Sequence, residues 1–254
     1  DLDELLEDYA AQKRAAADPP ARGRAPPALA VEAATLLDVL TDAVAGAVGP
    51  GAIHNRLALA WGQAPGGAGA DVIRRILVLT ADHELNASAF AARVAASTGA
   101  SLSACALAGL ATLSGPRHGG ATVAVRTFAA EAAEAGPSEA IRRRLLDDRA
   151  LPGFGHPLYP DGDPRAAALL ARFDPPEPLM ELQGAVMEIA GLAPTIDYAL
   201  VAACEAFRLP QDAPFALFSV ARCAGWIAHA IEQGQSDALI RPRARYVGPE
   251  PETT

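Results

Sequence analysis

Apolar residues recur with helical spacing along almost the whole chain, and this pattern limits the possible folds more than any other feature. In "ALAVEAATLLDVLTDAVAGAV", Leu36, Leu40 and Val44 fall on one face of a helix, and "GPG" at 49 to 51 ends it. The alternation of a β-strand is not convincing anywhere, so the predicted fold class is all-α. The same spacing predicts further helices near residues 70–80, 86–98, 101–113, 120–135, 138–147, 164–173, 179–191, 195–208 and 214–233.

Three segments rich in proline or glycine interrupt this pattern. "ADPPARGRAPP" at 17–27 and "RFDPPEP" at 172–178 contain paired prolines, and we expect them to be linkers or exposed loops. "LPGFGHPLYPDGDPR" at 151–165 also carries Phe154, Leu158 and Tyr159, which a merely solvated loop does not need. We therefore expect this third loop to fold down over a site.

The charge balance narrows the class of partner. The 254 residues include 30 acidic and 21 basic side chains, which gives a net charge of −9. Without an excess of Lys and Arg there is little to attract nucleic acid or anionic lipid, so neither is an expected partner. Small molecules and other subunits are the expected partners.

Features that decide the compartment favour the cytoplasm. No window approaches the uninterrupted apolar length that a membrane span needs, and "DLDELLEDYAAQKRAAADPP" lacks the basic and apolar regions of a secretory signal. Cys105, Cys204 and Cys223 have none of the spacings of metal or redox sites. We expect buried, reduced thiols.

Three of the five histidines lie where helices break: His83 in "TADHELNAS", His118 in "SGPRHGGA" and His156 in "PGFGHPLY". A single histidine of this kind is more often structural than functional, but three in similar settings favour a site. His54 and His229 lie in helical patterns without turn residues. For these two the structural interpretation is kept.

His118 and Asp197 suggest a proton-transfer pair. His118 precedes two glycines that open a helix, and the positive helix end disfavours a second positive charge on the ring. A neutral imidazole can donate to a carbonyl oxygen and stabilise the enol that forms when a neighbouring C–H loses its proton. Asp197 in "LAPTIDYALV" is the candidate base, since the helix start favours its ionised form; taken alone, an aspartate at this position is more often a helix-start residue than a base.

Arginines supply the context for an anionic substrate. Arg165 follows a helix start, Arg222 lies inside the apolar run "LFSVARCAGWIAHA", and Arg241 and Arg243 bracket a proline. A buried Arg222 needs an anionic partner, and no acid lies within one turn of it. A substrate carboxylate and a salt bridge to a distant residue are both open at this point.

Taken together, six motifs resemble those of the citrate synthase family in order and spacing, over about residues 52 to 250. No single motif would be specific, but the combination is. The motifs are "DHELNASAFAARVAASTGASL", "LSGPRHGGA", "LPGFGHPLYPDGDPRA", "PTIDYAL", "ARCAGWIAHAIEQ" and "RPRARYVGP".

The resemblance implies an all-helical homodimer whose large and small domains close over a cleft. It places the large domain at 1–120 and 208–254 and the small domain at 121–207. The implied activity is that of an acyltransferase of the citrate synthase type, which condenses acetyl-CoA or a similar acyl-CoA with oxaloacetate and hydrolyses the thioester in the tricarboxylic acid cycle. No metal and no bound cofactor are expected.

The resemblance also implies a role for each matching residue. Asp197 would take a proton from the acetyl methyl, His118 would hold the thioester oxygen, and His156 would polarise the keto group of oxaloacetate and protonate it. His83, Arg165, Arg222 and Arg241 would bind the dicarboxylate, with Arg241 reaching across from the partner subunit. The loop of Leu151, Pro152, Gly153, Phe154 and Gly155 would contact the CoA adenine.

The chain departs from the family pattern in three places. Pro157 and Leu158 stand where a basic residue and Val are more usual, and Arg117 replaces a small or apolar residue. The part ahead of "DHELN" is also shorter than in the family, as expected of a trimmed domain or of part of a longer protein. The alternatives left open are 2-methylcitrate synthesis from propionyl-CoA, citryl-CoA cleavage, and a non-catalytic paralogue that binds a CoA ester or dicarboxylate.

Overall fold

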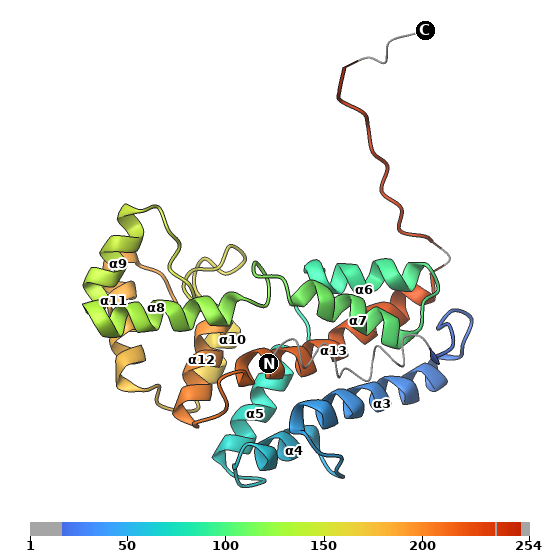
Figure 1. Cartoon of the computed structure of the whole chain (residues 1–254), viewed down its shortest axis with the longest axis horizontal. Helices are drawn as coiled ribbons and strands as arrows, with labels where there is room; N and C mark the ends of the chain where they lie inside the picture. The colour runs from blue at the N-terminus through green and yellow to red at the C-terminus, as the bar shows by residue number, and fades with distance from the viewer. Residues whose placement is uncertain (1–16, 237, 250–254) are drawn as a thin grey trace.

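The computed structural model describes residues 17–236 and 238–249, and this part of the chain is built from helices (Figure 1). It contains no β-strand, only two isolated bridges, so the predicted all-α fold class is confirmed. The helices are α3 (Pro26–Ala45), α4 (Ile53–Ala60), α5 (Ala68–Leu79), α6 (Ala87–Ser97), α7 (Leu102–Leu113), α8 (Ala121–Ala135), α9 (Pro137–Leu146), α10 (Pro164–Leu170), α11 (Glu177–Ala190), α12 (Ile196–Ala206) and α13 (Ala213–Gly234).

Helix α13 is the central element of the fold. It packs against α3, α5, α6 and α7, and in Figure 1 it runs between α6 and α7 on one side and α3 on the other. By length and mean hydropathy, 1.3, α13 has the character of a membrane-crossing helix, but 67% of its most apolar window is buried inside the molecule. The core therefore accounts for its hydrophobicity.

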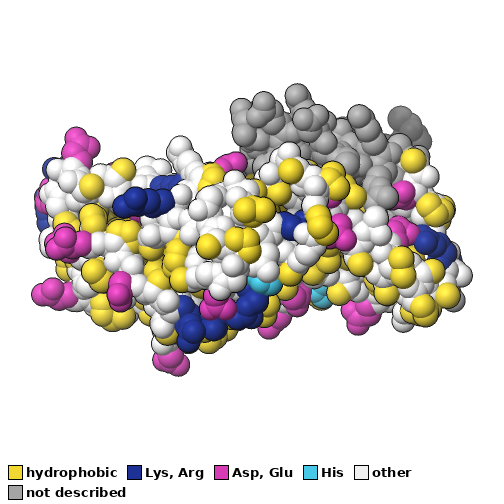
Figure 2. Space-filling model, turned by 90° about the horizontal axis from the view of Figure 1, so that it is seen from below, with side chains coloured by type: hydrophobic (Ala, Val, Ile, Leu, Met, Phe, Trp, Pro, Cys, Tyr) yellow, Lys and Arg dark blue, Asp and Glu magenta, His cyan; other side chains and the backbone are white. Residues whose placement is uncertain are grey.

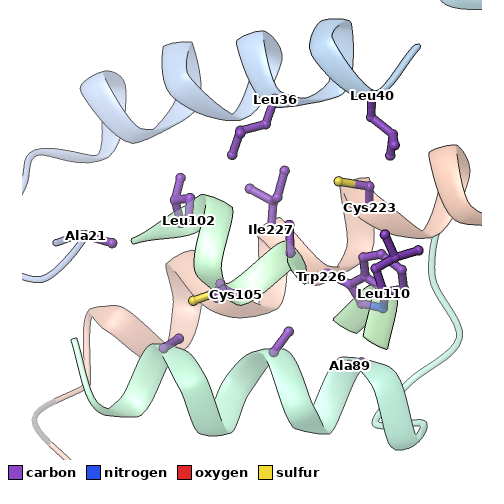
Figure 3. Close-up of a cluster of buried hydrophobic side chains, with 14 of the residues drawn as sticks. Ala21, Leu36, Leu40, Ala89, Leu102, Cys105, Leu110, Cys223, Trp226 and Ile227 are labelled. Atoms are coloured by element: carbon purple, nitrogen blue, oxygen red, sulfur yellow. The ribbon is translucent and has the colours of Figure 1, made fainter. Parts of the chain in front are cut away.

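The first hydrophobic cluster joins α3, α6, α7 and α13 (Figure 3). Leu36 and Leu40 of α3 point toward Ile227 and its neighbours on α13, and the Trp226 ring is fully buried beside α7. Gly109 allows this approach, because a Cβ there would lie 2.5 Å from the Trp226 ring. Any larger residue at this position would push α7 and α13 apart.

Two further clusters complete the core. One joins α4, α5, α10, α12 and the start of α13; the other joins α8, α9, α11, α12 and part of the loop at 151–155. Two short connections, between Leu113 and Ala121 and between Ala206 and Ala213, link the α8–α12 part to α7 and α13. The division into domains at 120/121 and 207/208 stays a prediction.

Two local features differ from the predictions. Helix α4 was not among the predicted helix ranges, although His54 was placed in a helical pattern, because its eight residues are too short for a periodic stripe that sets its bounds. The segment at 17–27 is not simply an exposed loop: Ala21 is buried in the first cluster, and its N–H donates to the Ala100 carbonyl oxygen. Its backbone therefore joins the fold before α3 begins.

Candidate functional site

One cavity of about 230 Å³ brings together side chains from five separate places in the fold. They come from the α5–α6 loop, the α7–α8 turn, the loop at 151–165 and its helix, and the first halves of α12 and α13. Figure 2 shows histidine side chains beside arginine side chains near the middle of the lower border of the molecule. Of the predicted site residues, His83, His118, His156, Arg165, Asp197 and Arg222 line this cavity.

His118 is held in the tight turn that separates α7 from α8. Its N–H donates to the Gly115 carbonyl oxygen, and the N–H of Gly119 donates to the Leu113 carbonyl oxygen at 2.8 Å. Burial lowers the pKa of His118, and the charge of Arg222 lowers it further. The direction agrees with the expected neutral ring, and its causes are burial and Arg222.

A hydrogen-bond network that sequence reasoning missed fixes the His118 ring. Ser88 Oγ lies 2.9 Å from His118 Nε2, and it accepts a hydrogen bond from Trp226 Nε1 at 3.0 Å. The same hydroxyl donates to Oδ1 of Asn86, the N-cap of α6, at 2.8 Å. Because the one proton of Ser88 goes to Asn86, Ser88 Oγ accepts from His118 Nε2, which places the proton of a neutral ring on Nε2. The only sequence signal was the cap-like "LNAS", which does not show what Ser88 faces.

Tyr159 was another missed residue of the site, noted only as an apolar loop residue. Its hydroxyl lies 2.9 Å from His83 Nε2, and its ring centroid lies 5.0 Å from that of His156. Nδ1 of His156 accepts from the Leu158 N–H, so the proton of a neutral His156 ring is on Nε2. Burial lowers the pKa of His83, as do Arg165, Arg222 and His156.

Asp197 lies in the first turn of α12 and is mostly buried. Burial raises the pKa of its carboxyl, and the charge of Arg165 only partly opposes this. The expectation that the helix start would dominate and favour the ionised form is wrong in direction, because desolvation outweighs it. A carboxylate destabilised in this way is a stronger base than an exposed one.

Asp163 organises the other side of the cavity. Its buried carboxylate caps α10, binds Arg165 through Nε and an Nη at 3.0 and 2.8 Å, and accepts the backbone N–H of Ile196. Burial alone would raise the pKa of Asp163, but Arg165 and the two backbone N–H groups lower it on balance. The sequence marked Asp163 only as a helix start. It also joins α10 to the start of α12, next to Asp197.

Arg222 has no acidic partner in the part of the chain that the structure describes. Its Nε donates to the Thr80 carbonyl oxygen at 2.9 Å, and its guanidinium lies 4.5 Å from the centroid of the Phe218 ring. Burial lowers the pKa of Arg222 to about 10, although Asp82 and Asp197 oppose this. The structure therefore does not show the distant salt bridge that the sequence left open, and the guanidinium faces the cavity.

The structure does not bring the remaining predicted residues to the cavity. Arg241 is exposed on the C-terminal segment, and the loop Leu151–Gly155 is not in the lining. Leu151 and Phe154 are buried in the third cluster, and the Gly153 carbonyl oxygen accepts from the Thr195 N–H. Gly153 has φ +84, and a Cβ there would lie 2.8 Å from Val125. The roles of this loop and of Arg241 stay predictions.

The described residues contain no group of three His, Cys, Asp or Glu side chains arranged to hold a metal ion. The three cysteines are buried and free, each inside a helix, as expected. His229, given a structural interpretation, lies 3.1 Å from Asp82 and 3.2 Å from Arg93, and it does not line the cavity.

Comparisons with known proteins show the family to which the chain belongs. A family model described as citrate synthase, C-terminal domain, matches residues 28–243. Citrate synthase 2 of Bacillus subtilis (strain 168) is 34% identical over 211 residues, which are 79% of this chain and 57% of the relative. The 2-methylcitrate synthase of Shewanella oneidensis (strain MR-1) is 33% identical over 206 residues, 77% of this chain and 55% of that protein. The chain thus spans just over half the length of these curated relatives.

Solved structures show the same fold. The citrate synthase of Thermoplasma acidophilum, in a ternary complex with carboxymethyl coenzyme A and oxaloacetate, superposes with a TM-score of 0.82 at 25% identity. The match covers 99% of this chain and 74% of that one. A citryl-CoA lyase from Hydrogenobacter thermophilus shares the fold at 24% identity, with a TM-score of 0.68 over 82% of this chain and 88% of that one.

Proposed function

We propose that this chain, which belongs to the citrate synthase family, condenses an acyl-CoA thioester with oxaloacetate; acetyl-CoA would give citrate and free CoA. One observation carries the proposal: Asp197, His118 and His156 line a single cavity together with Arg165 and Arg222. A base, two hydrogen-bond donors and two cations are what this reaction needs from side chains. The reaction type is that of an acyltransferase.

The first step forms the enol. The Asp197 carboxylate takes a proton from the carbon next to the thioester carbonyl, and the electron pair of that C–H bond shifts toward the thioester oxygen. His118 holds that oxygen by a hydrogen bond from Nδ1, and this requires the ring proton to move from Nε2 to Nδ1 and the Ser88 proton to turn from Asn86 Oδ1 to Nε2. The raised pKa of Asp197 makes it a stronger base for this step.

The second step joins the two substrates. The enol carbon attacks the keto carbon of oxaloacetate, a C–C bond forms, and the keto oxygen takes the proton of His156 Nε2. The Leu158 N–H at Nδ1 favours the tautomer with that proton in place. Water then attacks the thioester carbonyl and the C–S bond breaks; one water proton passes to the sulfur, so that CoA leaves as the thiol. The proton that Asp197 took from the acyl carbon restores His156, which returns both groups to their starting state.

The dicarboxylate would bind to the arginines. Arg222 faces the cavity without an acidic partner, and a planar guanidinium matches a carboxylate in a paired hydrogen bond. Arg165, which is already held by Asp163, would bind the second carboxylate of the substrate together with His83. We also propose a cytoplasmic homodimer without a bound cofactor, in which Arg241 comes from the partner subunit.

Two alternatives keep the same chemistry. A chain that prefers propionyl-CoA would make 2-methylcitrate, which the Shewanella oneidensis relative supports. A citryl-CoA lyase would run the carbon–carbon step backwards with the same base and acid. A non-catalytic paralogue that binds a CoA ester or a dicarboxylate is the alternative of a different class.

The test is release of the CoA thiol from acetyl-CoA and oxaloacetate, with Asp197→Ala as the inactive control. We expect release by the full chain and none by the variant. No release at saturating substrate contradicts the proposal. Calorimetric binding without turnover, and without exchange of the acetyl methyl protons, identifies the non-catalytic paralogue, while faster oxaloacetate formation from citryl-CoA identifies the lyase.

A further inference from the structure

A second cavity, of about 210 Å³, adjoins the candidate site. The two cavities share Gly119, Thr122 and Phe215 as lining residues. Gly119 directly follows His118, so the shared wall begins one residue from the group proposed to hold the thioester oxygen. The rest of the second cavity is lined by Ser114, Gly120, Val123, Arg126, Gln211 and Asp212.

The shared wall is an aromatic ring packed on a glycine. Phe215 lies in the first turn of α13, and a Cβ at Gly119 would lie 2.7 Å from its ring. Thr122, in the first turn of α8, is buried beside it. Because the Phe215 ring lines both cavities, its position sets how wide the passage between them is.

The second cavity has two charged lining residues, of which one is hydrogen-bonded at the edge of the cavity and the other is exposed to solvent. Arg126 donates to the Gln211 carbonyl oxygen, which joins α8 to the α12–α13 connection, and Asp212 is exposed. The wall shared with the site carries no charged group. This combination suits a hydrocarbon chain that enters from the site.

From this arrangement we propose that the second cavity receives the alkyl chain of the acyl-CoA, so that the substrate class is acyl-CoA esters longer than acetyl. The proposal rests on the proposed function. With the thioester oxygen at His118 and the reacting carbon at Asp197, a substituent on that carbon begins beside the wall of Thr122 and Phe215. Acetyl-CoA has no such substituent, and each methylene buried in the second cavity would raise kcat/KM by about fourfold.

The test compares acetyl-, propionyl-, butyryl- and hexanoyl-CoA with oxaloacetate, by thiol release from the full chain. Val123 lines the second cavity but not the first, and it is 65% exposed on α8, so Val123→Trp narrows the cavity from its outer side. Val78→Trp is the matched control, since Val78 is 66% exposed on α5 and lines neither cavity.

We expect the wild-type chain to favour the longer esters over acetyl-CoA. Val123→Trp should lower the kcat/KM ratio of hexanoyl-CoA to acetyl-CoA by about sixteenfold, which matches two lost methylene contacts. The control should leave this ratio unchanged. Phe215→Ala widens the passage between the two cavities and should raise the kcat/KM ratio of hexanoyl-CoA to acetyl-CoA. This variant provides a second test if Val123→Trp lowers the thermal midpoint of unfolding.

Three results would overturn the proposal. If the wild type prefers acetyl-CoA and neither variant shifts the ratio, the chain-binding role is wrong while the proposed function stands. If Val123→Trp slows acetyl-CoA and hexanoyl-CoA by the same factor, the second cavity serves CoA or the fold instead. If no ester releases thiol, the proposed function and this inference fail together.

Discussion

Ser88 Oγ lies 2.9 Å from His118 Nε2 and receives the indole N–H of Trp226 from its other side. The His118 ring is therefore held from α6, and through Ser88 from α13, although His118 itself belongs to the α7–α8 turn. Ser88 Oγ receives the Trp226 proton and directs its own proton to Asn86 Oδ1, so Nε2 of a neutral His118 ring donates to Oγ. Three elements distant in sequence thus orient one imidazole.

Ser88→Ala should lower kcat by about tenfold to a hundredfold, the usual cost of losing a partner that orients a functional histidine. The His118 ring would lose the contact that fixes its orientation. The KM for oxaloacetate should change little, since Ser88 does not line the cavity. Steady-state kinetics measures kcat, and a separate assay measures the rate of acetyl methyl-proton exchange. The two rates should fall by a similar factor.

Ser219→Ala is the matched control for that substitution. Ser219 is a buried serine of α13 whose Oγ has no hydrogen-bond partner among the described residues. Removing it should leave kcat unchanged. Equal losses in the two variants would show that the effect comes from packing and not from the contact with His118.

Asp197→Asn should abolish turnover and stabilise the fold at neutral pH. Because burial raises the pKa of Asp197 above its usual 3.8, the folded chain carries an unfavourable charge above the raised pKa. The gain in free energy of unfolding from Asn should be largest above the raised pKa and should disappear as pH falls toward 3.8, where the carboxyl is protonated in both the folded and the unfolded chain. Denaturant unfolding of both proteins across pH measures this gain. An equal gain at every pH would contradict the raised pKa of Asp197.

Asp163→Asn should destabilise the fold by about 3 kcal/mol, because it leaves the largely buried Arg165 without its carboxylate. The KM for oxaloacetate should rise as well, since Arg165 loses its orientation. The matched control is Asp71→Asn, which breaks contacts with Arg74 and Arg75 on the surface of α5 and should cost under about 1 kcal/mol. Similar losses in both variants would argue against a special role of Asp163.

Arg222→Gln should raise the KM for oxaloacetate by about tenfold to a hundredfold, since a charged hydrogen-bonding group contributes about 1.5 to 3 kcal/mol. Oxaloacetate should raise the thermal midpoint of the wild-type chain but not of the variant. Arg75→Gln is the control, because Arg75 pairs with Asp71 away from the cavity. A variant that oxaloacetate still stabilises would rule out Arg222 as a carboxylate ligand.

Helical periodicity was enough to predict most of the fold. Amphipathic helices with proline or glycine at their ends, such as α3 and α11, were located to within a few residues. Helix α4 was not, because eight residues give too little periodic signal. Nor was the packing of Ala21, since small apolar residues in a proline-rich segment look the same whether buried or exposed.

Residue type and position at helix breaks located the histidines and the carboxylate of the candidate site. The residues that orient them were not predictable in the same way. Ser88, Trp226 and Tyr159 act through contacts between distant segments, which no local pattern records. The pKa direction of Asp197 was also beyond local reasoning, since it depends on how deeply tertiary packing buries the start of α12.

Helix α13 carries Arg222 in the cavity and Trp226, one turn further on, in the middle of the first cluster. The helical backbone between Arg222 and Trp226 therefore connects the cavity to the first hydrophobic cluster. Ligand binding in the cavity should therefore slow amide hydrogen exchange in the buried part of α13, at residues that do not contact the substrate. The cavity and the first hydrophobic cluster should also unfold together.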